Sequence, residues 1–185
     1  LDAAQRIGRE VKWVTEENYA PLQLLIEGGD SYVGLQRGSA ESLAITAAGE
    51  FQYLDTPIPL SAVMAVTTSL VARKQGLAGR TTAAAVRKAA EEGFVLAALG
   101  IFDQGYYDRL GFATMPYTRR VLFDPTQLTV QAPKRTPHRF DASHSDLLHR
   151  SRLRRLRGHG SVNLLSPTSS RAEMVEVKSS GGLGW

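Results

Sequence analysis

The sequence contains no cysteine, which excludes a disulfide framework, a cysteine-ligated metal site and a thiol nucleophile. It also lacks any apolar run near the roughly 18 residues that a membrane-spanning helix needs, so we expect no membrane partner. The 4 histidines show neither metal-ligand spacing nor a Ser-His-Asp order, and no metal site is predicted. An apolar content of 43% and a charged content of 22% are those of an ordinary globular protein. The absence of cysteine fits a reducing compartment, and we expect a cytoplasmic protein.

Positive charge gathers in residues 134–157, although the net charge of the chain is only +4. Such a segment has two interpretations. It is a nucleic-acid-binding face, or it is a helix face that is solvated or pairs with acidic residues of a part of the protein outside this sequence. No known nucleic-acid-binding motif occurs here, so we favour the second interpretation and expect no nucleic-acid partner. The basic residues concerned are Lys134, Arg135, Arg139, Arg150, Arg152, Arg154, Arg155 and Arg157.

Hydrophobic periodicity and turn residues predict an α+β protein with mixed α/β layers, in which a helix crosses between parallel strands. Residues 22–26 are apolar but fit a helix or a strand equally well. The expected elements are, in order, a helix within residues 1–14, a strand over 42–47, a hairpin turn at 48–49, its partner strand over 50–54, a long buried strand over 60–70, a helix over 77–92, a central strand over 94–99, a short helix over 103–110 and a strand over 113–123.

A proline-rich linker over residues 124–137 predicts a domain boundary, with one domain over 1–130 and the beginning of another over 131–185. In the second part we predict a helix over 141–157, a short strand over 161–165 and a strand over 173–178. We also expect the chain to be a piece of a longer protein.

The segment from Arg73 to Gly79 joins an apolar, Thr-bearing strand to an alanine-rich helix. The first backbone N–H groups of a helix have no intrahelical partner, and the helix dipole adds partial positive charge there. Such a turn therefore predicts a site for a phosphate or a pyrophosphate. It is not a P-loop, because Gly79-Arg80-Thr81 lacks the lysine, and Gly76 to Gly79 does not supply a dinucleotide-binding Gly-x-Gly-x-x-Gly.

A second motif follows after the next strand, Tyr-Tyr-x-x-Leu-Gly-Phe from Tyr106 to Phe112. Together with the earlier Arg-x-x-Gly-x-Ala turn, and in this order, it resembles the GNAT superfamily of acyl-CoA-dependent N-acetyltransferases over residues 42–123. A closer likeness is to the enhanced-intracellular-survival (Eis) family, because the tract over 147–164 is similar to the opening of that family's second, GNAT-like domain. The resemblance implies a GNAT fold, acetyl-CoA as co-substrate, an amine acceptor such as an aminoglycoside or a lysine side chain, and a homo-oligomer, in that family a hexamer.

The same resemblance implies roles for particular residues. Tyr107 matches the family's general acid, and the family's general base is its own C-terminal carboxylate. The sequence departs from the family at Lys74 and Gln75, where arginines are usual, at Leu70, often a proline, and at Phe102-Asp103, often Ser-Glu. The residues expected to bind the cofactor are Val66, Thr67 and Thr68 along the pantetheine arm, Arg73, Lys74, Gln75, Gly76, Leu77, Ala78 and Gly79 at the pyrophosphate, and Phe102 and Asp103 beside it.

The chemistry of acetyl transfer leaves alternatives open at several residues. Tyr107 would protonate the departing sulfur, since tyrosine has a reference pKa of about 10 and is protonated at pH 7, but it could also be a core residue of the short helix. Of the pair, Tyr106 is the better candidate for the core. Asp103 fits a general base or a helix N-cap equally well. Two alternatives to an acetyltransferase remain, a module that binds acyl-CoA without turnover and a nucleic-acid-binding module using the face from Arg152 to Arg157.

Overall fold

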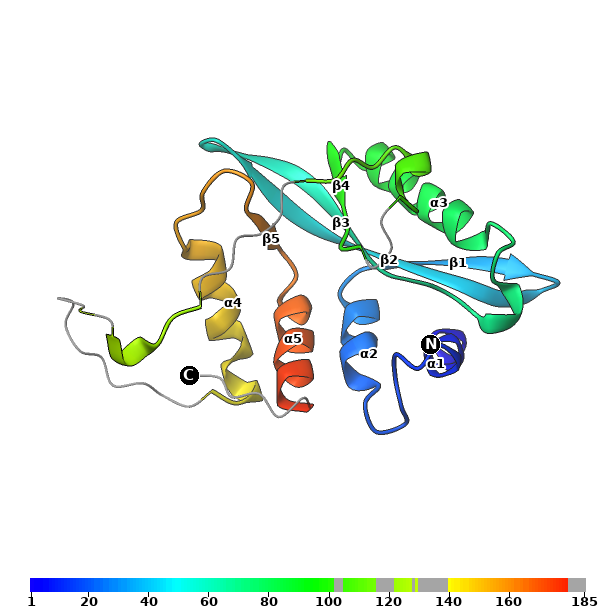
Figure 1. The fold of residues 1–185 in the computed structure, drawn as a ribbon, viewed down its shortest axis with the longest axis horizontal. Helices are drawn as coiled ribbons and strands as arrows, with labels where there is room; N and C mark the ends of the chain where they lie inside the picture. The colour runs from blue at the N-terminus through cyan, green and yellow to red at the C-terminus, as the bar shows by residue number, and fades with distance from the viewer. Residues whose placement is uncertain (102–104, 116–121, 128, 130–139, 180–185) are drawn as a thin grey trace.

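The computed structural model describes residues 1–101, 105–115, 122–127, 129 and 140–179. Its centre is a long hairpin of β2 (Ser39–Tyr53) and β3 (Thr56–Thr68), which pair antiparallel. The outer edge of β2 pairs with β1 (Asp30–Gln36) at one end and with β5 (Val162–Leu164) at the other. On the far side of the hairpin, β4 (Leu96–Ala98) runs parallel to β3. The described strands thus form one mixed sheet (Figure 1).

Helices cover both faces of this sheet (Figure 1). On one face, α3 (Leu77–Glu91) packs on β1, β2 and β3. On the other face, α1 (Asp2–Glu10) and α2 (Ala20–Glu27) enclose an apolar core around Leu43 and Ile45 of β2. The remaining helices, α4 (Ser145–Arg154) and α5 (Pro167–Ser179), pack on each other, and α5 also packs on α2. This layering confirms the predicted α+β class with mixed α/β layers.

The helix that follows the Arg73–Gly79 segment forms as its composition predicts. Alanines and other good helix formers dominate it from Ala83 onward, and its N-cap is Gly76 in the left-handed region, with φ of 75°. Gly93 follows its end with φ of 94°, as expected of a glycine that terminates a helix. Ala85 and Ala89 are buried, and their small side chains allow α3 to lie close to the sheet.

The predicted hairpin turn at residues 48–49 is wrong. β2 continues through both residues, and the turn lies at Leu54 and Asp55, with Leu54 at φ of 50°. Gly49 has another reason to be small, because a Cβ there would lie 2.8 Å from the carbonyl oxygen of Asn163 in β5. The glycine therefore serves the close approach of a distant strand rather than a turn.

Three other predicted elements differ in length or type. The strand predicted over 94–99 reduces to β4, which within the described residues has only β3 as a neighbour and so is not central there. In place of a helix over 103–110, the described residues contain one 3-10 turn, η2 (Asp108–Leu110), closed by Gly111 in the left-handed region. The helix predicted over 141–157 ends at Arg154. The predicted strand over 113–123 falls largely on residues 116–121, which lie outside the described residues, and the remainder is not strand.

Residues 173–178 are helical rather than extended. They belong to α5, which starts at Pro167, a residue suited to the first turn of a helix. A short alternation of apolar and charged residues also fits a helix, and packing on α2 stabilises the helical form. Gly28, at the end of α2, leaves the room that the side chain of Thr168 needs, since a Cβ there would lie 1.7 Å from the Thr168 hydroxyl.

Contacts cross the domain boundary predicted near residue 131. β5 joins the same sheet as β2, and Arg157 makes a 2.9 Å ion pair with Glu50. Next to it, Nδ1 of His159 accepts a 3.1 Å hydrogen bond from the Leu54 N–H, and its ring meets those of Phe51 and Tyr53 edge-on. The division into 1–130 and 131–185 stays a prediction.

Candidate active site

A cleft of 1020 Å³ opens where three parts of the chain meet. These are the end of β3, the first turn of α3 and the segment from Tyr106 to Leu110, called here the tyrosine segment. Four stretches of chain line it. The lining residues are Val11 and Trp13, Val66 to Thr68, Ala72 to Ala83 in part, and Tyr106, Tyr107, Arg109 and Leu110.

The β3 wall of the cleft owes its shape to a β-bulge. Leu43 of β2 is opposite Thr67 and Ile45 is opposite Met64, so two residues of β3, Ala65 and Val66, face a single residue of β2. Ala65 adopts φ of 50°, which an L-residue rarely does outside such special positions. Beyond Ala62, the last β3 residue paired with β4, the outer edge of β3 has no strand partner within the described residues. Among the described residues, the backbone groups of this edge are therefore open to an extended ligand.

The second wall is the loop from Arg73 to Gly76 and the first turn of α3. Lys74 and Gly76 both have positive φ, 61° and 75°, so the chain turns sharply before the helix begins. The first α3 N–H bonded within the helix is that of Arg80, which donates to the Gly76 carbonyl at 3.1 Å. The N–H groups of the three preceding residues are those that an α-helix leaves without an intrahelical acceptor. This is the geometry of an anion site.

The tyrosine segment closes the cleft from the other side. The rings of Tyr106 and Tyr107 meet edge-on with centroids 4.9 Å apart, and Tyr107 also meets Phe112 at 5.8 Å. The Arg109 guanidinium lies over the Tyr106 ring, 4.4 Å from its centroid, and its Nε donates to the Tyr106 carbonyl at 3.1 Å. Burial raises the pKa of Tyr107 above its ordinary value, and Tyr106 adds to the shift. Tyr107 is therefore a neutral phenol with a proton to donate at pH 7.

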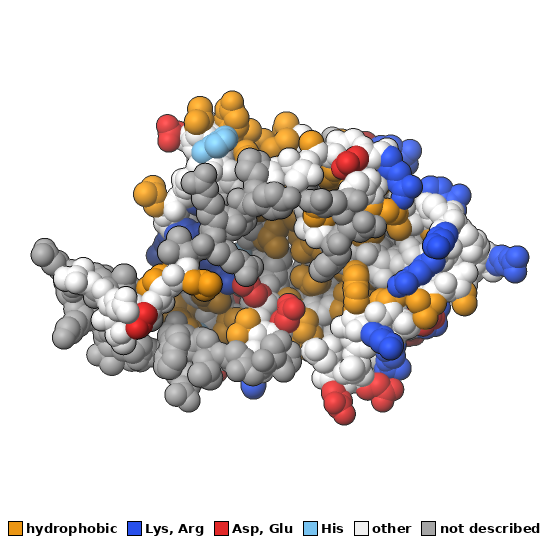
Figure 2. Space-filling model, viewed as in Figure 1, with side chains coloured by type: hydrophobic (Ala, Val, Ile, Leu, Met, Phe, Trp, Pro, Cys, Tyr) orange, Lys and Arg blue, Asp and Glu red, His pale blue; other side chains and the backbone are white. Residues whose placement is uncertain are grey.

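Positive charge surrounds the mouth of this cleft. Arg73, Lys74, Arg80 and Arg109 line it, and no carboxylate is among its described lining residues. Figure 2 shows lysine and arginine side chains gathered over α3 and the adjoining end of the sheet. A cleft of this charge favours a polyanionic ligand.

The structure brings together most of the residues predicted for the site. Val66, Thr67, Thr68 and Tyr107 all line the one cleft, as do Arg73, Lys74 and residues 76–79. Tyr106, the expected core residue, lines it too. Phe102 and Asp103 lie outside the described residues, and the roles of all these residues stay predictions.

Gln75 was expected at the pyrophosphate, but it does not line the cleft. Its side chain instead contacts Gln36 at the end of β1 and donates to the Val71 carbonyl at 3.2 Å. The side chain therefore braces the loop from outside. The loop's sharp turn at Lys74 and Gly76 accounts for this, because it directs successive residues to different sides.

Two lining residues were missed by sequence reasoning, Val11 and Trp13. They follow α1 directly and reach the cleft through the packing of α1 under the sheet. The one signal in the local sequence is the tryptophan itself, a large aromatic residue at the end of the predicted helical stretch. Trp13 is 45% exposed, so a large aromatic surface is open to a ligand.

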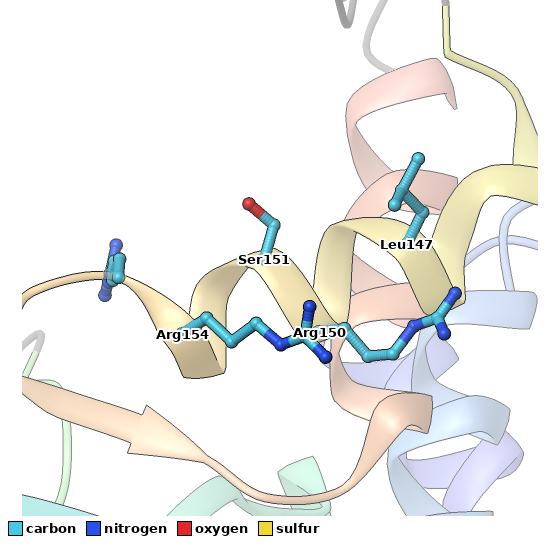
Figure 3. A pocket seen from close by; sticks show the side chains of 5 residues that line it. Leu147, Arg150, Ser151 and Arg154 are labelled. Carbon is cyan, nitrogen blue, oxygen red and sulfur yellow. The ribbon is translucent and has the colours of Figure 1, made fainter.

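The arginine-rich tract around α4 is largely engaged within the molecule. Arg152 pairs with Glu173 of α5, Arg157 pairs with Glu50, and Arg155 donates to Asn163. Two others, Arg150 and Arg154, line a shallow 550 Å³ hollow on the exposed side of α4 (Figure 3). The ion pairs of Arg152 and Arg157 are thus made with acidic residues of this chain.

Metal-binding and membrane-spanning features are absent from the described residues. No group of three or more histidine or acidic side chains is arranged to hold a metal ion in that part of the chain. Nor does any helix there combine the length and the apolar character that a membrane span requires.

The order of the strands, the bulge in β3 and the helix that begins at the cleft define the class of fold. It is the GNAT fold of acyl-CoA-dependent N-acetyltransferases, and several solved structures share it. Eis1 from Mycobacterium abscessus superposes with a TM-score of 0.69 at 16% identity, covering 96% of this chain and 45% of that one. The fold implied by the sequence resemblance, including its likeness to the Eis family, is thereby confirmed.

Two other solved structures match a smaller part of the chain. A probable N-acyltransferase from Enterococcus faecalis has a TM-score of 0.53 and 15% identity, covering 59% of this chain and 28% of that one. A GCN5-related N-acetyltransferase from Kribbella flavida has a TM-score of 0.51 and 13% identity, with 60% and 30% covered. This chain thus spans less than half the length of all three proteins. No family model matches the sequence, and no curated protein does either.

Proposed function

We propose that this chain carries the coenzyme site of an N-acetyltransferase, which moves an acetyl group from acetyl-CoA to a primary amine. The observation that supports this most strongly is the composition of one cleft. It holds an open strand edge at a bulge, the N-terminus of α3, and the side chain of Tyr107. By resemblance, we extend the proposal to an aminoglycoside-like or lysine-like acceptor and to a homo-oligomer.

The coenzyme would bind along two of these parts. The N–H groups at the start of α3 would hold the pyrophosphate, helped by the charges of Arg73 and Lys74. The amides of the pantetheine arm would pair with the free edge of β3 at Val66 to Thr68, as an added strand does. Both parts rely mainly on backbone groups. This explains how the site tolerates Lys74 where the Eis family has an arginine.

The transfer itself needs an electrophile, a proton donor and a route for the leaving group. Acetyl-CoA supplies an activated thioester. Backbone N–H groups at the β3 bulge would polarise its carbonyl, the amine nitrogen would bond to the carbonyl carbon, and the carbon–sulfur bond would break. Tyr107 would give its proton to the departing sulfur, because its raised pKa keeps it protonated at neutral pH.

The acceptor would enter from the side of Val11 and Trp13. This side lies across the cleft from the loop between Arg73 and Gly76, which we call the coenzyme loop. An exposed indole ring attracts cations and sugar-like surfaces, and an aminoglycoside or a lysine side chain offers both charge and an aliphatic or ring surface. The base that removes the ammonium proton is not assigned to a residue of this chain.

Thiol release from acetyl-CoA, measured with a panel of aminoglycosides and lysine-containing peptides, tests the enzyme. A parallel thermal melt, with and without acetyl-CoA, tests binding alone. We expect a rise in melting temperature with acetyl-CoA and amine-dependent thiol release. Stabilisation without release by any amine would leave only the non-catalytic module, whereas no stabilisation would refute the coenzyme site itself.

A further inference from the structure

Glu10, the last residue of α1, makes a hydrogen bond to the segment between β3 and the loop that lines the cleft. Its Oε2 accepts the backbone N–H of Leu70 at 3.2 Å, and its Oε1 accepts from Arg6 at 2.8 Å. Leu70 begins the 3-10 turn η1 (Leu70–Ala72), which leads directly into the coenzyme loop. The first N–H of such a turn has no acceptor within the turn, so a carboxylate from another helix supplies one.

Arg6 anchors this carboxylate to the hairpin. Its guanidinium contacts Glu41 of β2 at 3.3 Å and also donates to the Ala40 carbonyl. The Glu41 carbonyl in turn accepts the N–H of Ser69 at 2.9 Å, one residue before η1. The side chain of Glu41 is nearly buried, whereas those of Arg6 and Glu10 are 40% and 28% exposed, so Glu41 holds the inner end of this cluster in the fold.

The position of Glu10 in the chain gives the contact its meaning. The cleft residue Val11 follows Glu10 directly, and the cleft residue Trp13 comes two residues after Val11. On the other side of the hydrogen bond, Ala72 and Arg73 follow Leu70 into the opposite wall of the cleft. One carboxylate thus joins the wall where the acceptor would lie to the wall where the coenzyme would lie.

We propose that Glu10 is a positioning residue that couples the binding of acyl-CoA at the loop to the order of the α1 wall where the amine binds. The proposal rests on the coenzyme site proposed above. Ordering of η1 by the coenzyme would fix Glu10, and with it Val11 and Trp13. Because such coupling is reciprocal, an amine bound at the α1 wall would also strengthen coenzyme binding.

Hydrogen–deuterium exchange with mass spectrometry, using CoA as the probe, tests this coupling. In the unchanged protein, we expect CoA to slow amide exchange both in residues 70–79 and in α1. In Glu10→Ala, we expect slowing in residues 70–79 to persist at saturating CoA, while slowing in α1 is lost. The same substitution should weaken CoA affinity by at most about tenfold, which is the full effect of losing a hydrogen bond to a charged group.

Two variants separate the hydrogen bond from general damage. Glu10→Gln keeps an oxygen that can accept from Leu70, and we expect CoA affinity within about threefold of the unchanged protein and retained slowing in α1. Glu16→Ala removes a carboxylate in the same region that pairs with Arg9 and is 81% exposed, and it should behave as the unchanged protein does.

The outcomes distinguish the coupling from the coenzyme site. If CoA protects residues 70–79 but never α1, or protects α1 equally in Glu10→Ala, the coupling is refuted and the coenzyme site stands. If Glu10→Gln loses the α1 effect as Glu10→Ala does, the acceptor role of Glu10 is refuted. If CoA protects neither segment in the unchanged protein, the coenzyme site and the coupling fall together.

Discussion

Replacing Tyr107 by phenylalanine removes one oxygen and keeps the ring. The ring's edge-on contacts with Tyr106 and Phe112, at 4.9 and 5.8 Å between centroids, remain available to phenylalanine. We therefore expect the free energy of unfolding to change by no more than about 1 kcal/mol. A general acid contributes about 10² to 10⁴ in rate, so kcat should fall by that factor, or about 3 to 5 kcal/mol of activation free energy.

The assay is thiol release at saturating acetyl-CoA and amine, with acetyl-CoA affinity measured separately by calorimetry. Affinity should stay within about threefold, because the binding proposed for the coenzyme uses backbone groups of β3 and α3. Tyr106→Phe removes the same atom from the neighbouring ring, and its loss of kcat should be at least about tenfold smaller.

The pH dependence gives a second readout of the same residue. Since burial raises the pKa of Tyr107, its proton stays in place through neutral pH and is lost only above its ordinary value of 10.0. The alkaline fall of kcat should therefore lie above pH 10 and be absent from what activity Tyr107→Phe retains. An unchanged kcat in Tyr107→Phe, or a larger loss in Tyr106→Phe, would refute the assignment of the acid.

Three further changes test the scaffold. Gly76→Ala should cost about 1 to 2 kcal/mol of unfolding free energy in a urea titration, because only its positive φ opposes a side chain; Gly100→Ala, with open space and no positive φ, is the control. Gly49→Ala should cost about 1 to 3 kcal/mol in the same titration by pushing β5 off β2. The substitution Glu41→Gln tests the Glu41 carboxylate in thermal melts. Hydrogen bonds from Ser39, then Ser69 and Arg6, lower the pKa of this carboxyl below its ordinary value. Its stabilisation is fully present above its ordinary pKa of 4.5 and is lost as pH falls through the lower folded value, so the loss in melting temperature should be clear at pH 7 and shrink as the pH is lowered through that range.

Local signals were sufficient for α3 and for the end of β3. Alanine-rich composition between Gly76 and Gly93 determines α3, and the apolar, Thr-bearing run before Arg73 determines the end of β3. These elements depend on residues near in sequence. The α3 side of the site could also be predicted from local sequence, because Gly76 directly precedes the first residue of the helix.

Contacts between residues far apart in the sequence determine the elements that the local pattern did not predict. Gly49 favours a turn when only its neighbours in sequence are considered, but its small size is required by the approach of β5. Residues 173–178 alternate like a strand, but packing on α2 stabilises them as a helix. Trp13 enters the cleft only because α1 lies under the sheet. The bulge at Ala65 leaves no trace in composition, because its positive φ is imposed by pairing with β2.

The hydrogen bond between His159 and Leu54 joins residues 105 positions apart. The entropy lost in closing a chain loop rises with its length, and contacts between distant residues form late in folding. We therefore expect the hairpin and α3 to assemble first and β5 to dock last. During synthesis, the part of β2 that pairs with β5, residues 49–51, would meanwhile present an unpaired edge that another chain could join. A truncation before residue 158 should accordingly promote self-association, and its measure is the oligomer size in solution.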